Sequence, residues 1–288
     1  MIYQKVAICG NRRQDSHLEG LAALFSYMSR CGLRVLVHAP FAAYLEEKGV
    51  DTSAAVPVEN LPEGVSLVMS IGGDGTFLRT FRWVGAKQIP ILGVNTGHLG
   101  FLAGCRIEDA DKMLEKIFRG DIVVERRIAL TVEGEDLPDE IWPFALNEIS
   151  MVRDERASLI NVNCYINDRL LASYRADGLI VSTPTGSTAY NLSAGGPILQ
   201  PTLDALVLSP IAPHTLTLRP VVVNANSSVS LEVKSRSRNF RLNLDDRSYL
   251  LPVDTKLTIR KADFAALLVR DSETDFAAVL RDRLLWNA

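Results

Sequence analysis

The sequence predicts an α/β protein in which an N-terminal parallel-sheet domain is followed by a β-rich domain. Over the first 120 residues, short apolar runs alternate with amphipathic helical patterns, which is typical of a parallel sheet covered by helices. From residue 121, apolar and polar residues alternate one by one in short segments, which is typical of antiparallel strands. The chain has 288 residues, which is enough for two domains of modest size.

The elements of the first half follow from its hydrophobic pattern. The apolar runs at residues 6–9, 33–37, 65–71 and 89–94 are expected to be strands. Helices are expected at residues 16–30, 76–84 and 110–119. Ser16 is available as the N-cap of the first helix, and Gly120 follows the last one as a stop signal. These elements describe a Rossmann-like domain over residues 1–120.

The second half changes to a period of two. Strands are expected at residues 228–234, 239–245 and 256–260, where every second residue is apolar. A final helix is expected at residues 276–286, because its apolar residues recur at helical spacing. We therefore expect a β-rich, β-sandwich-like domain over residues 121–270. The C-terminal helix, within residues 271–288, is expected to return to the first domain.

Composition and charge exclude several classes of protein. The chain has 31 basic and 34 acidic residues and a net charge of −3, without basic runs, which argues against a nucleic-acid partner. No apolar run approaches the ~18 residues of a membrane span, and the N-terminus is too polar for a signal peptide. The four cysteines lie far apart and form no C-x-x-C pair, which predicts free thiols and neither disulfides nor a zinc site. The expected compartment is the cytoplasm.

A glycine-rich loop follows the strand at residues 65–71 and opens the next helix. Residues 72–76 read Gly-Gly-Asp-Gly-Thr, and glycines let the backbone approach a phosphate closely. The positive end of the helix dipole would favour an anion at this place, at the carboxyl edge of the sheet. Asp74 is either a proton acceptor for an attacking hydroxyl, a ligand of a divalent cation, or a helix cap. The chain contains neither a P-loop motif nor the standard dinucleotide fingerprint.

Three further segments carry polar groups that suit a ligand. Residues 93–102 form a second glycine-rich loop, in which His98 is either an acid–base group or a hydrogen-bonded turn residue. Asn147 and Glu148 close the apolar run at residues 141–146 and either contact adenine or ribose or form a turn. Residues 182–193 contain six serines and threonines, and Tyr190 among them could stack on a base. The alternative for this block is a surface turn, and the absence of a G-x-S-x-G motif argues against a serine hydrolase.

Together these segments resemble the motifs of NAD kinases of the bacterial type. The matching motifs lie at residues 72–76, 95–102, 147–148, 177–197 and 210–220, in the order of the family. Diacylglycerol, sphingosine and phosphofructo-kinases share a loop like the first motif, whereas the block at residues 183–190 is specific to NAD kinases. The resemblance covers most of the chain, from residue 6 to residue 286.

The resemblance implies transfer of the γ-phosphate of ATP to the 2′-hydroxyl of the adenosine ribose of NAD, giving NADP, with Mg²⁺ or another divalent cation. Asp74 would be the proton acceptor, and Gly72, Gly73 and Thr76 would complete the phosphate loop. Residues at family contact positions would bind NAD: Gly75, Asn147, Glu148, Arg175, Asp177, Thr188, Ala189, Tyr190, Ser193 and Ala212. Mg²⁺ would arrive with ATP rather than on dedicated protein ligands. A homodimer or homotetramer is also implied, because in the family some NAD contacts come from a neighbouring subunit.

One position departs from the family pattern. Many members carry glutamine after an Asp-Gly pair, where this chain reads Asp245, Asp246 and Arg247. Arg247 could still hydrogen-bond the ligand or a phosphate.

Two other functions remain open at this point. A lipid kinase would need a membrane-docking surface, and the sequence shows no basic or strongly apolar patch for one. A non-catalytic dinucleotide sensor would not need Asp74, which is present. The sequence also leaves open whether ATP, another triphosphate or polyphosphate is the donor.

Overall fold

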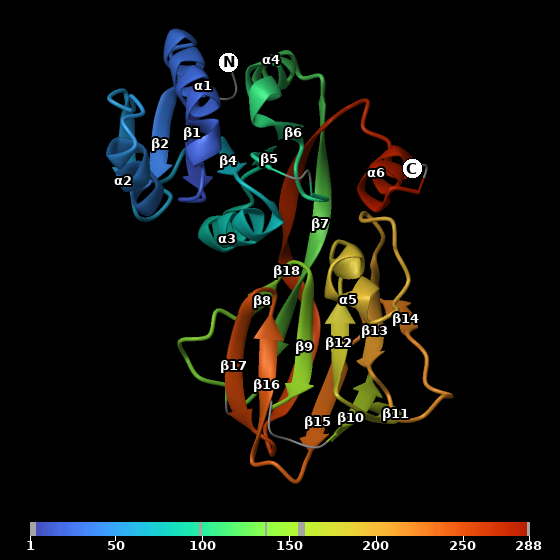
Figure 1. Cartoon of the computed structure of the whole chain (residues 1–288). Helices are drawn as coiled ribbons and strands as arrows, with labels where there is room; N and C mark the ends of the chain where they lie inside the picture. The colour runs from blue at the N-terminus through green and yellow to red at the C-terminus, as the bar shows by residue number, and fades with distance from the viewer. Residues whose placement is uncertain (1–3, 98–99, 136, 155–158, 287–288) are drawn as a thin grey trace. The chain divides into compact units, whose positions relative to one another are not determined.

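The structure, a computed structural model, describes residues 4–97, 100–135, 137–154 and 159–286. The chain divides into two compact units (Figure 1). Unit 1 comprises Met1–Arg126 and Ala266–Ala288, and unit 2 comprises Arg127–Ala265. Two strands, β7 (Ile122–Glu133) and β18 (Lys256–Asp271), have residues in both units.

Unit 1 is built around a parallel sheet in the order β5-β4-β1-β2-β3. Its strands are β1 (Lys5–Gly10), β2 (Arg34–His38), β3 (Ala55–Val58), β4 (Leu67–Ile71), β5 (Ile91–Asn95) and β6 (Cys105–Arg106). Its helices are α1 (Leu18–Arg30), α2 (Ala39–Glu47), α3 (Asp74–Val84), α4 (Ala110–Arg119) and α6 (Phe276–Leu284). The C-terminal part of β18 also joins this sheet, with Leu268 opposite Ile91 in a parallel pair.

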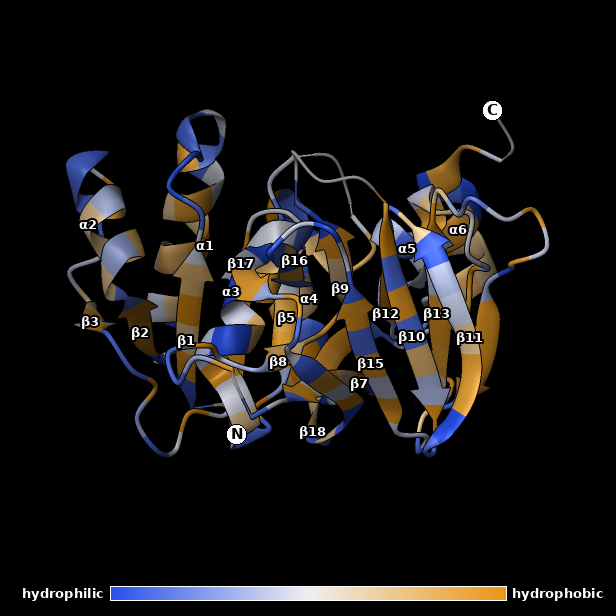
Figure 2. Ribbon diagram, turned by 90° about the horizontal axis from the view of Figure 1, so that it is seen from below, coloured by the Kyte–Doolittle hydropathy of each residue, from blue (hydrophilic) through white to orange (hydrophobic). Residues whose placement is uncertain are grey.

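The central strands of unit 1 are buried and mostly apolar because helices cover the sheet. Every residue of β4 and β5 is buried, as expected for parallel strands that are covered on both faces. Figure 2 shows the corresponding hydrophobic colour along β1 and β2. Helix α4 contributes Met113, Leu114 and Ile117 to the same core. The predicted α/β parallel-sheet architecture is confirmed.

Some local predictions were wrong. The sequence analysis missed α2 and β3, although Pro40 in the first turn of α2 is a recognised helix-start signal. Ser16 does not cap α1, because it lies in a short 3-10 turn and the N-cap is His17. Helix α3 starts at Asp74, two residues earlier than expected.

Unit 2 consists almost entirely of antiparallel strands. One sheet has the order β14-β13-β12-β9-β16-β17, and β11, β10, β15 and β18 pair in a second one. The strands are β8 (Phe144–Ala145), β9 (Glu148–Arg153), β10 (Ile160–Ile166), β11 (Arg169–Ala176), β12 (Gly178–Ser182), β13 (Ala205–Ile211), β14 (Val221–Asn224), β15 (Val229–Lys234), β16 (Asn239–Leu244) and β17 (Arg247–Pro252). A 3-10 turn η4 (Gly186–Thr188) and the short helix α5 (Tyr190–Ser193) follow β12.

The core of unit 2 lies between its two sheets. Residues of β9 and β16, such as Met151 and Leu242, share one apolar cluster with residues of β10 and β15, such as Val162 and Leu231. Burial alternates along β15 and β16, as their period-two pattern predicts. This arrangement agrees with the predicted β-sandwich-like class. None of the helices in the described part of the chain combines the length and the apolar content needed to cross a bilayer.

Candidate active site

The glycine loop of unit 1 connects β4 to α3 and has little space for side chains where it turns. At Gly72 φ is +145°, and a Cβ there would lie 2.4 Å from Oγ1 of Thr76, so that only glycine fits. Gly73 and Gly75 are exposed, and no other group lies within 4 Å of where their Cβ atoms would stand. The loop therefore presents backbone N–H groups at the start of a helix, the arrangement that binds phosphate.

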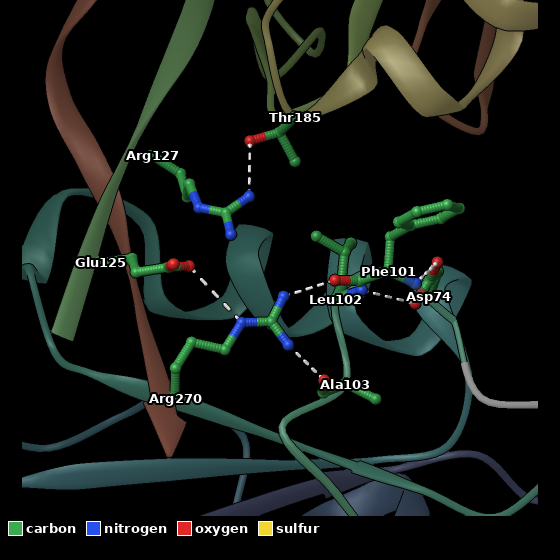
Figure 3. Close-up of polar contacts among 8 residues, drawn as sticks. All are labelled: Asp74, Phe101, Leu102, Ala103, Glu125, Arg127, Thr185 and Arg270. Carbon is green, nitrogen blue, oxygen red and sulfur yellow. Dashed lines mark hydrogen bonds and ion pairs between the residues drawn. The ribbon is translucent and has the colours of Figure 1, made fainter. Parts of the chain in front are cut away.

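The carboxylate of Asp74 binds a second loop instead of capping its own helix. Its Oδ2 accepts the N–H of Phe101 at 3.0 Å and its Oδ1 accepts the N–H of Leu102 at 3.1 Å (Figure 3). The N-cap of α3 is Gly73, and no side chain caps the helix. The helix-cap alternative for Asp74 is therefore wrong. Each carboxylate oxygen accepts one N–H and retains capacity for a further hydrogen bond.

The second loop, which follows β5, packs directly against Asp74. A Cβ on Gly100 would lie 2.2 Å from Oδ1 of Asp74, and one on Gly93 would lie 2.6 Å from the carbonyl oxygen of Leu102. Both glycines are therefore required by close packing. His98, the expected acid–base candidate of this loop, lies outside the described residues, and its role stays a prediction.

Two arginines that the sequence analysis missed also bind this loop. Arg270, on β18, donates hydrogen bonds to the carbonyl oxygens of Phe101 and Ala103, and its Nε lies 3.5 Å from Oε2 of Glu125 (Figure 3). Arg283, on α6, donates from Nε to the carbonyl oxygen of Gly100 at 3.1 Å. The hydrogen bonds from these arginines to the loop join residues more than 160 positions apart, so no local sequence pattern predicts them.

In unit 2, Asp245 organises the segment that carries Asn147 and Glu148. Its carboxylate accepts the N–H groups of Leu146, Asn147 and Glu148 at 2.9, 2.7 and 3.3 Å. Asn147 lies between β8 and β9, and Glu148 is the first residue of β9. The pair therefore opens a strand, whereas the sequence analysis expected it to close one.

The carboxyl group of Glu148 is buried and incompletely hydrogen-bonded. The side chain is 8% exposed, and burial, together with the nearby Asp245 charge, raises the pKa of Glu148 to about 8. Its Oε2 has no hydrogen-bond partner in the described part of the chain. A buried oxygen in this condition has an unmet capacity that a ligand hydroxyl can satisfy. Burial also raises the pKa of Asp245, although its three N–H donors act against this.

The serine- and threonine-rich block that follows β12 is a buried polar network. Oγ1 of Thr183 donates to the carbonyl oxygen of Leu146 at 2.6 Å, and a Cβ on Gly186 would lie 2.1 Å from the carbonyl oxygen of Asn147. The Asn191 amide donates to the carbonyl oxygens of Ser187 and Pro197. Because Ser182, Thr183, Thr185 and Ser187 are buried, the alternative of a surface turn is wrong for most of the block; Ser193 at its end is exposed. The block is fixed against the segment that carries Asn147.

Tyr190 stands at the edge of this network, at the start of α5. The residue is 39% exposed, and its backbone N–H lowers the pKa of the Glu148 carboxyl, an effect smaller than that of burial. Burial raises the pKa of the Tyr190 phenol, and the charges of Asp177 and Glu148 add to this. Thr188, Ala189 and Ser193 lie in the same turn. Unit 2 thus brings Asn147, Glu148 and Tyr190 into one neighbourhood.

The remaining predicted contact residues have mixed surroundings. Arg175 is exposed on β11, and Asp177 accepts a hydrogen bond from Nε of Arg153 at 2.6 Å. Ala212 has φ +44°, a left-handed conformation that is strained for alanine and typical of functional sites.

Arg247 is engaged by backbone groups and an aromatic ring. Its guanidinium donates to the carbonyl oxygens of Trp142 and Phe144 and lies 5.1 Å from the centroid of the Trp142 ring. These contacts hold the segment that precedes Asn147, and a ligand contact of Arg247 stays a prediction.

Buried Arg127 also supports the block, donating from Nη1 to Oγ1 of Thr185 at 3.3 Å (Figure 3). The sequence analysis missed this residue too.

Comparison with known proteins identifies the family. Residues 6–122 match the ATP-NAD kinase N-terminal domain, and residues 146–271 match the ATP-NAD kinase C-terminal domain. An NAD kinase from Porphyromonas gingivalis is 40% identical over 287 residues, covering 99% of both chains. One from Bacteroides fragilis is 39% identical over 288 residues, covering 99% of this chain and 98% of the relative.

Solved structures of this family have the same fold. A yeast NADH kinase complexed with NADH superposes with a TM-score of 0.87 at 25% identity, covering 99% of this chain and 88% of that one. An NAD kinase from Archaeoglobus fulgidus in complex with ATP gives a TM-score of 0.71 at 26% identity, covering 93% and 94%. The resemblance inferred from the motifs is confirmed, and the chain belongs to the NAD kinase family.

Proposed function

We propose that this protein transfers the γ-phosphate of ATP to the 2′-hydroxyl of the adenosine ribose of NAD and so produces NADP. The observation that carries the proposal is the setting of Asp74. Its carboxylate is partly buried, held by two N–H groups, and set in a loop of exposed glycines at a helix start. This combination supports the assignment of Asp74 as a proton acceptor beside a phosphate-binding backbone.

Unit 2 is proposed to bind NAD. Oε2 of Glu148, which has no hydrogen-bond partner among the described residues, is suited to a ribose hydroxyl, and the exposed Tyr190 is suited to stacking on a base. The pKa of Glu148, raised to about 8, keeps the carboxyl largely protonated near pH 7, so that it can both donate and accept. The other proposed NAD contacts are Gly75 in unit 1, with Asn147, Arg175, Asp177, Thr188, Ala189, Ser193, Ala212 and Arg247 in unit 2.

In the proposed reaction, the 2′-oxygen attacks the γ-phosphorus while its proton passes to Asp74, and ADP leaves. Phosphoryl transfer passes through a loose transition state, so that proton loss can come late and an ordinary carboxylate is a sufficient acceptor. The N–H groups at the start of α3, from Gly73 to Gly75, are proposed to stabilise the phosphate charge. The N–H groups of Gly72 and Thr76 donate to the carbonyl oxygens of Val94 and Gly73, so these two residues are proposed to shape the phosphate loop.

A divalent cation such as Mg²⁺, when bound with ATP, would neutralise charge on the transferring group. We propose that this cation is held mainly by the triphosphate; among the described residues, no group of three histidine, cysteine or acidic side chains could hold a metal ion. Asp74 is the one carboxylate in the sequence of the glycine loop, and it is the residue of this loop that would contact such a cation.

The donor triphosphate is proposed to occupy a basic cavity in unit 1. This cavity of about 710 Å³ lies at the carboxyl ends of β1 and β2, and Arg12, Arg13, Arg79 and Arg82 line it together with Trp83. Among the described residues no acidic side chain lines it, and planar guanidinium groups bind phosphate oxygens in pairs. Arg79 also donates to Oγ1 of Thr76 at 3.1 Å, which links the cavity to the glycine loop.

Other parts of the proposal concern the whole protein. A homodimer or homotetramer is proposed, and β11, an edge strand with the exposed side chains Leu170 and Leu171, suits pairing with another copy. The four cysteines are free, which suits the proposed cytoplasmic compartment. We also propose that the functional domains follow the expected boundaries near residues 120 and 270.

The experiment is an assay of the purified chain with NAD, ATP and Mg²⁺, in which NADP and ADP are both quantified. Parallel reactions contain diacylglycerol or sphingosine in place of NAD, since a lipid kinase shares the glycine loop. Formation of NADP that requires all three components supports the proposal. Phosphorylation of lipid alone, or binding of NAD with no turnover, would replace it with the lipid-kinase or the sensor alternative.

A further inference from the structure

Asp74 is held indirectly by two arginines from the C-terminal part of unit 1. Arg270 is only 7% exposed and donates to the carbonyl oxygens of Phe101 and Ala103, while Arg283 donates to that of Gly100. Glu125, whose Oε2 lies 3.5 Å from Nε of Arg270, balances part of the buried charge. The loop from Gly100 to Ala103 therefore has guanidinium groups on its carbonyl side.

Two successive peptide groups connect these arginines to the Asp74 carboxylate. The peptide between Gly100 and Phe101 accepts from Arg283 at its carbonyl oxygen and donates its N–H to Oδ2 of Asp74. The next peptide accepts from Arg270 at the carbonyl of Phe101 and donates the N–H of Leu102 to Oδ1 (Figure 3). A peptide group that accepts from a cation at one end becomes a stronger donor at the other, because hydrogen bonds in a chain polarise one another.

The two series of hydrogen bonds, one from each arginine, end on different oxygens of the Asp74 carboxylate. A carboxylate that accepts a single hydrogen bond can still rotate about its side-chain torsions. One donor on each oxygen fixes both the position and the plane of the carboxylate. Gly100, which has no room for a Cβ against Asp74, brings the loop close enough for both bonds.

We infer that Arg270 and Arg283 are positioning residues for Asp74: through the peptide groups of residues 100–102 they hold its carboxylate in the orientation that accepts the proton. The inference rests on the proposed function, since it concerns the group that we assign as proton acceptor. The competing explanation is a purely structural role, in which the arginines tie β18 and α6 to the loop and affect only stability.

A double-mutant cycle distinguishes these explanations. Arg270→Met, Arg270→Lys, Arg283→Met and Arg283→Lys are made in the wild-type and the Asp74→Asn backgrounds, with Arg281→Met as the control. Arg281 is exposed on the same helix as Arg283. Single-turnover NADP formation, KM for NAD and for ATP, and thermal melts are measured for every variant.

The inference predicts a loss in turnover that depends on Asp74. Arg270→Met should lower kcat by roughly 10- to 100-fold with both KM values within about 3-fold, and Arg283→Met by roughly 3- to 10-fold, as for interactions made mainly in the transition state. Lysine should restore part of each loss, and Arg281→Met should behave as wild type. In the Asp74→Asn background the same arginine substitutions should lower kcat by less than about 3-fold, because the effects of residues that act as a unit are not additive.

The inference would be overturned if the arginine substitutions lowered kcat by the same factor in the Asp74→Asn background as in the wild type. A wild-type kcat in Arg270→Met would also overturn it. If Arg270→Met does not fold, the Arg283 variants carry the same test, since Arg283 is only partly buried. Hydrogen exchange of the segment 100–103 adds a readout that needs no turnover. Exchange should be faster in Arg270→Met, Arg283→Met and Asp74→Asn than in Arg281→Met. Unchanged exchange in the arginine variants would refute the inference even if the wild-type protein formed no NADP.

Discussion

Replacing Asp74 by asparagine removes the proposed proton acceptor with the smallest change in size, but it does not leave the loop intact. Asparagine has one acceptor oxygen, whereas Asp74 accepts N–H groups with both of its oxygens, at 3.0 and 3.1 Å. One of the two N–H groups, from Phe101 or Leu102, would then face the asparagine NH₂, donor against donor. The loop loses one charge-assisted hydrogen bond and gains a repulsive contact.

The magnitude follows from these contacts. Hydrogen bonds to charged groups contribute about 1.5–3 kcal/mol, and an unsatisfied donor costs a similar amount, so Asp74→Asn should lower the free energy of unfolding by about 1–3 kcal/mol. For a chain of this size, the melting temperature should fall by roughly 2–10 °C. Loss of the general base should lower turnover by about 10²-fold or more. The two effects are measured separately, by thermal melts and by single-turnover NADP formation with the protein fully folded.

The matched control is Asp111→Asn, because Asp111 is an exposed carboxylate in the first turn of α4. It should change neither the melting temperature nor the turnover appreciably. An Asp74→Asn variant whose turnover stays within a few-fold of wild type would refute the catalytic assignment. A melting temperature equal to that of wild type would show that the two N–H bonds do not hold the loop.

Four further changes have distinct expected results. Tyr190→Ala should weaken NAD binding by about 1–3 kcal/mol if the exposed ring stacks on a base, and calorimetry that shows unchanged affinity would remove it from the site. Arg82→Ala should raise KM for ATP with little effect on KM for NAD; the reverse pattern would argue against the basic cavity as the donor site. Arg247→Ala should mainly lower the melting temperature, because its guanidinium binds backbone carbonyls and the Trp142 ring. An increase in KM for NAD without a change in stability would instead indicate a ligand contact. Glu148→Gln should flatten the pH dependence of stability: the folded pKa of about 8 exceeds the ordinary value of 4.5, so wild-type stability falls as pH rises from about 4.5 to 8, and parallel curves for both proteins would contradict this.

Elements with strong local signals were predictable from the sequence. Helix α4 has the bounds that were expected, because its apolar face is periodic and Gly120 ends it in the left-handed conformation at φ +83°. The glycine loop was placed correctly between a buried strand and a helix, since its composition has few alternatives. Helix α2 was missed because it begins directly after β2, with no polar segment between them.

The partners of Asp74 were not predictable in the same way. Its carboxylate binds N–H groups 27 and 28 residues away. Nearly every residue has a backbone N–H, so the sequence does not show which of them will donate to a given side chain. Arg270 donates to carbonyl oxygens of the same loop that lie 167 and 169 residues away in the sequence. Nothing in the sequence distinguishes this arginine from the others, so the contact could not be predicted. Hence the sequence singled out Asp74 as a candidate proton acceptor, but the helix-cap alternative could be rejected only from the tertiary structure.

The proposed function is tested most directly by the identity of the product formed from NAD, ATP and Mg²⁺. Wild-type protein should form NADP with the new phosphate on the 2′-oxygen of the adenosine ribose, and one ADP for each NADP. Chromatography and phosphorus NMR of the product would establish both points. Absence of NADP under conditions in which the folded protein binds NAD, or a phosphate on any other position, would contradict it.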